Sequence, residues 1–446
     1  MKPSIRAALV LAALLASCVD EREAMTVSTI RVGALLPFSG DLAASGVNLE
    51  RPLIMAAEAV NARGGIDGRE VTVLTVDSNR YFPNPLEGFE THQETLRAFL
   101  LGDTSHPLVA EDERIIPGAG VDALVGPLVP ELSVRLAAEA RREQVVHMTA
   151  NVTPQSNVSG RCSFSLFPSF RVLGLALGQQ MISDGIRDAS VLYLEDDFHT
   201  KLLGQLQAAF TSTASGGRNL RTTPTAADRA SYVEDLRAAL ADQPDALVLF
   251  APPRLAARIV ADLTALDAAQ AGFQWYFGPL LRVEDFPANV LGGVLNGGVG
   301  VAPGVDPERS AAFREAFVER WDAEPTLDAH YLYDTMTVLL LGLRDAAAQN
   351  SGVNLTSDAT YAASCAAVPA KTTGGAPVGP VDALSGDIYE RATEDLDYTG
   401  LSGPIELGAT GSAGDGLVEI WRVRSGGDSR IETVTVRSAR DVLGAP

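Results

Sequence analysis

Short apolar runs alternate with helical patterns from the start of the chain. Residues 30–36 (IRVGALL) are an apolar run followed by the turn sequence 37–40 (PFSG), which is typical of a buried strand. Residues 48–62 place apolar side chains at helical spacing, and the glycines that follow are expected to end the helix. Residues 71–76 (VTVLTV) predict the next strand, so this stretch forms a β-α-β unit with parallel strands.

The same order of strand, loop and helix recurs through the middle of the chain. The expected strands cover residues 123–125, 145–149, 190–194, 246–250 and 274–277, with helices at about 130–143 and through residues 202–210 and 254–266. This repetition predicts an α/β fold with doubly wound parallel sheets. At the C-terminal end the period changes, and residues 417–424 and 431–437 predict an antiparallel hairpin.

Two segments interrupt the pattern. Residues 81–118 contain four prolines and one expected helix, at about 91–101, and residues 349–397 are rich in Ala, Gly, Thr and Pro. We interpret both segments as surface insertions with loop character. The apolar run 336–343 is too short to span a bilayer and is expected to be a buried helix.

The first eighteen residues have the layout of an export signal. Lys2 and Arg6 precede the ten-residue apolar run 7–16, and the small-residue sequence 15–17 (LAS) precedes Cys18. The ending resembles a bacterial lipobox, in which the cysteine receives lipid and becomes the mature N-terminus. The alternative is an ordinary cleaved signal with an incidental cysteine.

The charge of the chain excludes some functions. The formal net charge is −21, and removal of residues 1–17 takes away two basic and no acidic residues, which gives −23. Such an acidic surface repels nucleic acid and anionic lipid headgroups. We therefore expect no nucleic-acid partner, and we expect the protein to attach to the membrane through its lipid anchor only. Two cysteines remain after Cys18, Cys162 and Cys365, and they form either a disulfide or two separate buried thiols.

Five motifs in order give the chain a family resemblance. They are residues 30–40 (IRVGALLPFSG), 61–68 (NARGGIDG), 125–127 (VGP), 331–334 (YLYD) and 398–405 (YTGLSGPI). Together they resemble the periplasmic solute-binding proteins of the leucine/isoleucine/valine-binding type, as a bacterial lipoprotein. The resemblance implies the type I periplasmic binding protein fold, with two doubly wound lobes joined by a hinge, closing around a small molecule.

The resemblance also divides the chain. After the signal peptide 1–17 and a linker 18–28, we expect lobe 1 to comprise 29–153 and 279–397, and lobe 2 to comprise 154–278 and 398–446. The implied partners are a small-molecule ligand and an ABC permease, and the implied location is the periplasm or cell envelope. No cofactor or metal is implied.

Candidate ligand contacts lie in the loops after the strands, because open α/β sheets bind ligands there. The candidates are Ser39, Leu42, Val129, Pro130, Glu131, Asn151, Thr153, Phe198, Pro252 and Leu280. Three of them have alternatives: Thr153 as a helix cap or turn, Phe198 as lobe-core packing, and Glu131 as a solvated side chain rather than the partner of a cationic group.

The chain departs from the amino-acid-binding pattern at two loops. Leu128, Val129 and Pro130 stand where hydroxyl residues usually hold the ligand carboxylate, and Pro130 has no N–H to donate. Leu280 and Leu281 stand where an acidic residue usually meets the ligand ammonium. A buried ammonium without a counter-charge is costly, so a more apolar or differently charged ligand fits better.

We find no sequence signature of catalysis, neither a nucleophile elbow nor a metal-binding helix nor a phosphate loop, and expect no enzyme. His147 lies within an apolar strand and is interpreted as a core residue, whereas His199 is near the expected ligand site. The acidic run 195–197 is interpreted as a solvated loop. The leading hypothesis is a lipid-anchored solute-binding protein of an ABC importer; the alternative is an envelope sensor or interaction protein with the same fold.

Overall fold

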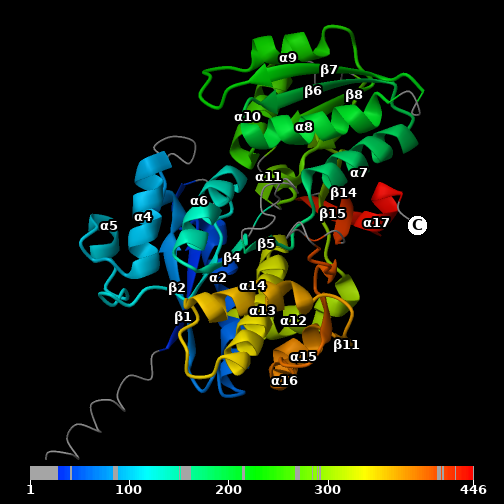
Figure 1. Cartoon of the computed structure of the whole chain (residues 1–446). Coiled ribbons are helices and arrows are strands. Elements are labelled where there is room, and N and C mark those ends of the chain that lie inside the picture. The colour runs from blue at the N-terminus through cyan, green and yellow to red at the C-terminus, as the bar shows by residue number, and fades with distance from the viewer. Residues whose placement is uncertain are drawn as a thin grey trace, which may run out of the picture.

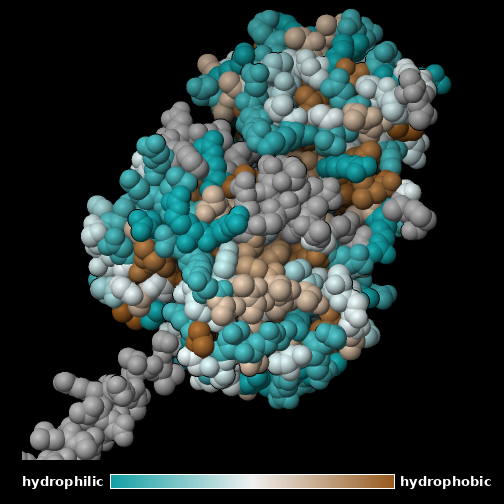
Figure 2. Space-filling view, in the orientation of Figure 1, coloured by the Kyte–Doolittle hydropathy of each residue, from teal (hydrophilic) through white to brown (hydrophobic). Residues whose placement is uncertain are grey.

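The computed structural model describes residues 29–40, 43–83, 89–149, 151, 162–212, 216–266, 272–283, 285–288, 290, 293–408, 413, 416–426 and 428–444. The predictions made for the export signal and for Cys18 lie outside these residues. The described chain folds into two bodies, which we call lobe 1 (below in Figure 1) and lobe 2 (above). On the face seen in Figure 2, hydrophilic side chains lie on both lobes, with smaller hydrophobic areas between them.

Lobe 1 is built on a five-stranded parallel sheet. Its strand order is β2-β1-β3-β4-β5, with β1 (Ile30–Leu36), β2 (Val71–Asp77), β3 (Ala123–Val125), β4 (Val146–Thr149) and β5 (Ser163–Ser165). Apolar side chains of α2 (Ala43–Asn61) and α13 (Leu327–Gln349) form one core with this sheet. Those of α4 (Phe89–Leu101) and α6 (Pro130–Arg142) form a second core on the other side. The β-α-β pattern of the sequence is therefore confirmed.

Lobe 2 is built on a seven-stranded sheet of order β15-β14-β10-β9-β8-β6-β7. Its strands are β6 (Asp188–Leu194), β7 (Asn219–Thr225), β8 (Ala246–Phe250), β9 (Gln274–Phe277), β10 (Val299–Pro303), β14 (Leu417–Gly426) and β15 (Asp428–Ser438). β14 and β15 form the predicted antiparallel hairpin. Helices α7 (Phe170–Ser183), α8 (Asp197–Phe210) and α17 (Ala439–Leu443) contribute to one core, and α9 (Val233–Leu240), α10 (Pro253–Ala265) and α11 (Asp285–Ala288) to another.

The prediction of a loop-like insertion over residues 349–397 is wrong. The segment contains α14 (Asp358–Ala370), β11 (Ala376–Val378), α15 (Pro380–Ser385), α16 (Asp387–Glu390) and the first residues of β12 (Leu396–Gly400), which pairs with β11 and β13 (Gly403–Pro404). Small residues allow close packing within the segment and against α13, since a Cβ on Gly375 would lie 2.2 Å from the backbone carbonyl carbon of Asp395. A Cβ on Gly342 of α13 would lie 2.5 Å from a side-chain carbon of Val368 in α14. Alanine-rich helices can approach each other this closely.

The segment 81–118 has the predicted helix, as α4, together with the short helix α5 (Pro107–Ala110) and several turns. The equally short helix α3 (Ser78–Tyr81) leads into it. Although the segment is rich in turns, Tyr81, Leu96 and Phe99 are buried in the lobe 1 core. It therefore packs against the edge of the sheet at β2 rather than projecting from it.

The chain crosses between the lobes at three places. Leu166 is buried in a lobe 1 core and Phe167 in a lobe 2 core, so the first crossing follows β5 directly. The second crossing follows β10 and leads into α12 (Pro307–Trp321), whose Phe313 and Phe317 lie in lobe 1. The third lies between Leu407, in lobe 1, and Val418, in lobe 2.

These crossings correct the expected lobe boundaries. Strand β5 belongs to the lobe 1 sheet, although lobe 2 was expected to begin at residue 154. Strand β10 belongs to the lobe 2 sheet, although residues 279–397 were assigned to lobe 1. Residues 398–407 pack in lobe 1. Strand β5 pairs with β4, the strand just before it, and β10 pairs with β9 and with the distant β14. Local periodicity predicts a strand but not which strand it pairs with.

Side-chain caps determine where helices begin after two of the crossings. Ser169 Oγ accepts from Val172 N (3.4 Å) at the start of α7, and Asp306 Oδ1 accepts from Glu308 N (3.0 Å) and Arg309 N (3.1 Å) at the start of α12. Such caps satisfy backbone donors of the first helical turn. The chain therefore enters lobe 2 at the start of α7 and lobe 1 at the start of α12, and the short segments before these helices connect the lobes.

Candidate ligand-binding site

The carboxyl ends of the parallel strands of both sheets meet at the junction of the lobes. The first crossing leaves the carboxyl end of β5, and the second leaves the carboxyl end of β10. The other parallel strands of each sheet run in the same direction as these two. The loops predicted to contact ligand therefore gather at this junction, where open α/β sheets bind their ligands. On one side of the junction α6 of lobe 1 contacts α8 of lobe 2.

Asn151 organises the lobe 1 side. Its side chain is buried, and its Nδ2 donates to the Pro127 carbonyl (2.6 Å) and to Ser133 Oγ (2.6 Å). Ser133 Oγ in turn donates to the Pro127 carbonyl (2.9 Å). The amide therefore joins the end of β4 to the loop after β3 and to the first turns of α6. Its Oδ1 has no partner among the described residues and remains an acceptor.

Gly126 allows that loop to pass close to β1. Its φ is +90°, and a Cβ at this position would lie 2.5 Å from the Leu35 carbonyl oxygen. Only glycine avoids both the strained backbone and the collision. The following peptide bond, Gly126–Pro127, is cis.

His147 lies in the core, as predicted. Burial lowers the pKa of its imidazole to about 4, so the ring is neutral at neutral pH. Because a carbonyl only accepts, Nε2 carries the proton and donates to Gly126 O (2.7 Å), and Nδ1 accepts from Ser163 Oγ (2.8 Å). The imidazole thus links β4, β5 and the loop after β3.

The structure describes only some of the remaining ligand-contact candidates in lobe 1. Ser39 is exposed at the carboxyl end of β1, and its carbonyl accepts from Asn79 Nδ2. Val129 is partly buried and is the N-cap residue of α6. Leu42 and Thr153 lie outside the described residues, as do the side chains of Pro130 and Glu131, although α6 begins at Pro130.

The lobe 2 candidates are mainly apolar. Phe198 packs edge-on against Phe170 and His199, with both ring centroids 5.0 Å away, so it joins the lobe core as the alternative proposed. Pro252 is the partly buried N-cap residue of α10. Leu280 lies in the short 3-10 helix η4 (Pro279–Leu281) after β9 and is 39% exposed, unlike the buried Leu281.

Two residues of the acidic run 195–197 have different partners at the start of α8. Asp196 caps α8 by accepting from His199 N (2.7 Å) and also accepts from His199 Nδ1 (2.8 Å), whereas Asp197 pairs with Lys201. His199 is buried, and its Nε2 has no partner among the described residues. The acidic residues therefore organise the start of α8. Within the described part of the chain, no cluster of His, Cys, Asp and Glu side chains has the arrangement of a metal site.

Two residues of the YLYD motif make buried hydrogen bonds, Tyr331 at the crossings and Asp334 within lobe 1. Tyr331 Oη donates to Gly304 O (2.8 Å), at the second crossing, and its ring stacks on Phe167, at the first, with centroids 4.4 Å apart. Asp334 accepts from Leu401 N (2.9 Å), from Ser402 and from Tyr398 Oη (2.8 Å). Burial raises the Asp334 pKa to about 6 even though these donors favour the ionised form. Tyr331 therefore braces the joint between the lobes, whereas Asp334 fixes residues 398–402 on α13.

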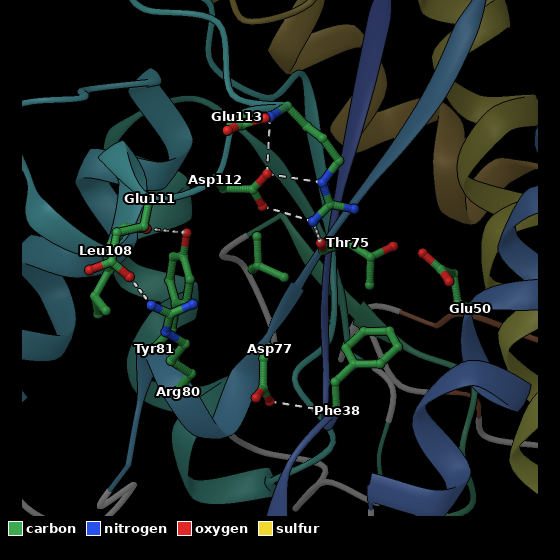
Figure 3. Close-up of a pocket in the computed structure, with 12 residues that line it drawn as sticks. Phe38, Glu50, Thr75, Asp77, Arg80, Tyr81, Leu108, Glu111, Asp112 and Glu113 are labelled. Carbon is green, nitrogen blue, oxygen red and sulfur yellow. Dashed lines mark hydrogen bonds and ion pairs between the residues drawn. The ribbon is translucent and has the colours of Figure 1, made fainter.

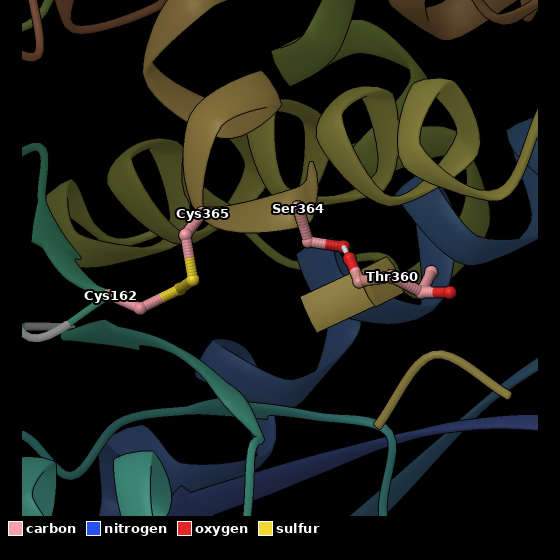
Figure 4. Close-up of a disulfide and its surroundings, with 4 residues drawn as sticks. All are labelled: Cys162, Thr360, Ser364 and Cys365. Atoms are coloured by element: carbon pink, nitrogen blue, oxygen red, sulfur yellow. Dashed lines mark hydrogen bonds between the residues drawn. A yellow bond between two sulfur atoms is a disulfide. The ribbon is translucent and has the colours of Figure 1, made fainter. Parts of the chain in front are cut away.

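Cys162 and Cys365 form a disulfide (Figure 4). The bond joins the residue before β5 to α14, so both of its ends belong to lobe 1. The Cα atoms are 5.1 Å apart although 203 positions separate the residues in sequence. The sequence left open whether these cysteines form a disulfide or two separate buried thiols, and the structure contains the disulfide.

The family follows from the sequence profile that matches this chain. A profile described as periplasmic binding protein matches residues 29–80 and 110–428. The chain belongs to the periplasmic binding protein family. The match omits residues 81–109, most of which form the turn-rich segment beside β2. No curated protein sequence matches the chain.

Solved structures share the fold at low sequence identity. A solute-binding protein of an ABC transporter from Rhodopseudomonas palustris, in complex with 3,4-dihydroxybenzoic acid, has a TM-score of 0.66 at 15% identity and covers 92% of this chain and 98% of its own. A leucine-binding protein from Thermotoga maritima has a TM-score of 0.66 at 17% identity with the same coverage. A branched-chain amino acid binding protein from Streptococcus pneumoniae, in complex with isoleucine, has a TM-score of 0.65 at 15% identity and covers 91% of this chain and 100% of its own. The type I periplasmic binding protein fold is thereby confirmed.

Several buried polar residues of the junction were not predicted from the sequence. Ser133, Ser163 and Ser165 are buried polar residues that hold Asn151 or His147, and Ser165 Oγ donates to the Asn151 carbonyl (2.9 Å). Serines on an apolar helix face or in a buried strand could have indicated a buried hydrogen-bond network, because buried hydroxyls need partners. Their partners lie 14 to 18 positions away in sequence, and no local pattern identifies them.

Proposed function

We propose that this protein is an extracytoplasmic solute-binding protein that holds a small molecule between its lobes and delivers it to an ABC importer. The observation that carries the proposal is mechanical: each lobe has its own sheet and its own cores, the strand ends of both meet at the junction, and within the described chain the backbone passes between the lobes at three places. Such lobes can rotate about the joint without exposing either core. Family membership supports both the role and a location outside the cytoplasm.

The proposed ligand is amino-acid-like or more apolar. Leu280 offers an exposed apolar side chain after β9, and no acidic residue follows Gly278-Pro279 directly. Asn151 Oδ1 offers an acceptor for one ligand N–H or O–H group. A molecule with an apolar body and one hydroxyl or N–H donor fits these groups, and two of the solved relatives are complexes with 3,4-dihydroxybenzoic acid and isoleucine. The lipid on Cys18 and the importer as partner belong to the same proposal.

The test measures thermal unfolding of the mature chain with a panel of aliphatic amino acids, aromatic acids and neutral metabolites. We expect one chemical class to raise Tm, because a ligand that binds only the folded state stabilises it. Asn151→Ala should weaken binding of that class about tenfold, the effect of losing a buried hydrogen-bond partner. Leu280→Ala should weaken it a few-fold, by loss of apolar contact.

Matched controls separate these effects from general damage. Asn219→Ala removes an exposed amide at the start of β7, and Leu101→Ala removes a leucine of similar exposure (41%) on α4. Both should leave affinity unchanged. A panel without any Tm shift would overturn the solute-binding role and favour the sensor or interaction protein. Equal effects of the junction variants and their controls would overturn the proposed site.

A further inference from the structure

A pocket at the outer edge of lobe 1 is built in part by chain that the family profile does not match. It lies where edge strand β2 ends, between the core elements β1, α2 and β2 and the segment around α5 (Figure 3). The unmatched stretch 81–109 supplies Tyr81 and Leu108, and residues 111–114 follow directly. No described residue among the predicted junction contacts lines this pocket.

The pocket has the size of a small-molecule site. Its volume is about 410 Å3, within the range of pockets that hold small ligands. Phe38, Tyr81 and Leu108 provide apolar surface. Tyr81 Oη donates to Leu108 O (3.2 Å), and burial raises the Tyr81 pKa to about 12, so the phenol stays neutral at neutral pH.

The walls carry more negative than positive charge. Five carboxylates and two guanidinium groups line the pocket, which leaves a net charge of −3: Glu50, Asp77, Glu111, Asp112 and Glu113 against Arg80 and Arg114. Both cations are already engaged. Arg80 pairs with Glu111, and Arg114 pairs with Asp112 (2.7 Å) and donates to the Thr75 carbonyl. Asp77 is used by the backbone, because it accepts from Phe38 N (3.0 Å) and Asn79 N (3.1 Å).

On one wall of the pocket, two polar groups have no hydrogen-bond or ion-pair partner among the described residues. Glu50, on α2, has no ion pair or hydrogen bond to any described residue, and it acts on Arg114 only through space. Thr75 is 2% exposed, and its Oγ1 has no hydrogen-bond partner in the described part of the chain. Figure 3 shows the Thr75 side chain extending toward Glu50, with the Phe38 ring beside them. A buried hydroxyl without a partner costs free energy, so its retention points to a group that completes it.

We propose that this pocket binds a small organic amine, with the ammonium group held between the Glu50 carboxylate and the Thr75 hydroxyl. An ammonium has three N–H donors and no acceptor, which suits an acceptor-only carboxylate and a hydroxyl oxygen. The apolar body of the amine packs on Phe38 and reaches toward Tyr81 and Leu108. A carboxylate ligand is disfavoured, because the net charge of the walls repels it.

The test is isothermal titration of the mature chain with three compounds of one shape: 2-phenylethylamine, 2-phenylethanol and 3-phenylpropanoate. The amine should bind, and the alcohol and the carboxylate should bind at least about tenfold more weakly, since they lack the charge-assisted bond. Glu50→Gln should weaken amine binding about tenfold. Thr75→Val, which keeps the side-chain shape, should weaken it a few-fold.

Two controls make the result decisive. Glu90→Gln removes one negative charge from an exposed position on α4 outside the pocket and should leave amine binding unchanged. Asn151→Ala at the lobe junction should also leave it unchanged, so that failure of this site and failure of the solute-binding role remain distinguishable. If Thr75→Val does not fold, Glu50→Gln against Glu90→Gln decides alone. Absence of amine binding, equal binding of all three compounds, or equal effects of the two glutamate variants would overturn the proposal.

Discussion

The two lobes present their junction-facing strand ends in different ways. In lobe 1 these ends are tied by buried polar groups: Asn151 bonds the loop after β3 and α6, His147 bonds the same loop and β5, and the disulfide holds the chain before β5 to α14. In lobe 2 the corresponding loops present Phe198, Pro252 and Leu280. Both lobes use parallel strands followed by helices, so the difference lies in the loops.

The difference indicates that the two lobes have different roles at the junction. Buried hydrogen bonds are directional and hold groups in one geometry, whereas apolar contacts adapt to the shape of what they cover. Lobe 1 therefore has the properties of a rigid, orienting wall, and lobe 2 those of a cover that closes over an apolar body. Mutations are therefore expected to reduce stability most at the disulfide of lobe 1 and least at the aromatic packing of lobe 2.

The largest effect is expected from the disulfide. The double variant Cys162→Ser with Cys365→Ser should lose about 2–4 kcal/mol of unfolding free energy, because the bond restricts the unfolded chain. Urea denaturation followed by tryptophan fluorescence measures it lobe by lobe, since Trp321 lies in lobe 1, whereas Trp275 and Trp421 lie in lobe 2. The Trp321 transition should move to lower urea. Reduction of the unaltered protein should reproduce the shift, and a shift confined to the lobe 2 tryptophans would contradict the comparison.

The second effect depends on pH and also belongs to lobe 1. His147 has a pKa of about 4 in the folded protein, below the 6.5 of an unfolded histidine, so the unfolded state binds the proton first. Stability is therefore lost as pH falls below about 6.5, until the folded-state pKa is reached. Between pH 7.5 and 4.5 the unaltered protein should lose about 2–3 kcal/mol more than His147→Asn, as measured by urea denaturation at each pH. Parallel pH profiles of the two proteins would show that His147 is not buried in its neutral form.

The smallest effect is expected in lobe 2. Phe198 is only partly buried on the lobe core, so Phe198→Ala should cost about 1–2 kcal/mol, less than a fully buried phenylalanine. Thermal unfolding gives the cost, and titration of the ligand found by the panel gives its effect on affinity. A change in stability alone assigns Phe198 to core packing. A loss of affinity at equal stability would instead make it a ligand contact, and lobe 2 would then orient the ligand as well.

Local pattern was sufficient for most elements of the fold. Apolar runs such as 30–36 and 246–250 predict strands because both faces of a parallel strand are buried. Strand β7 (NLRTTPT) was missed because it lies at a sheet edge, is partly exposed and carries polar side chains. The order of the motifs along the sequence also indicated the family and its two-lobed fold.

The sequence by itself determined the alternation of strands and helices, the acidic surface, the absence of signatures of catalysis and the resemblance to solute-binding proteins. Only the tertiary structure decided which sheet receives β5 and β10, that Cys162 meets Cys365, that Ser133 holds Asn151, and that Thr75 and Glu50 share a pocket. The physical reason is that periodicity records how each residue meets its immediate surroundings, buried or exposed. It carries no information on which distant segment supplies those surroundings, and that is determined when the whole chain packs.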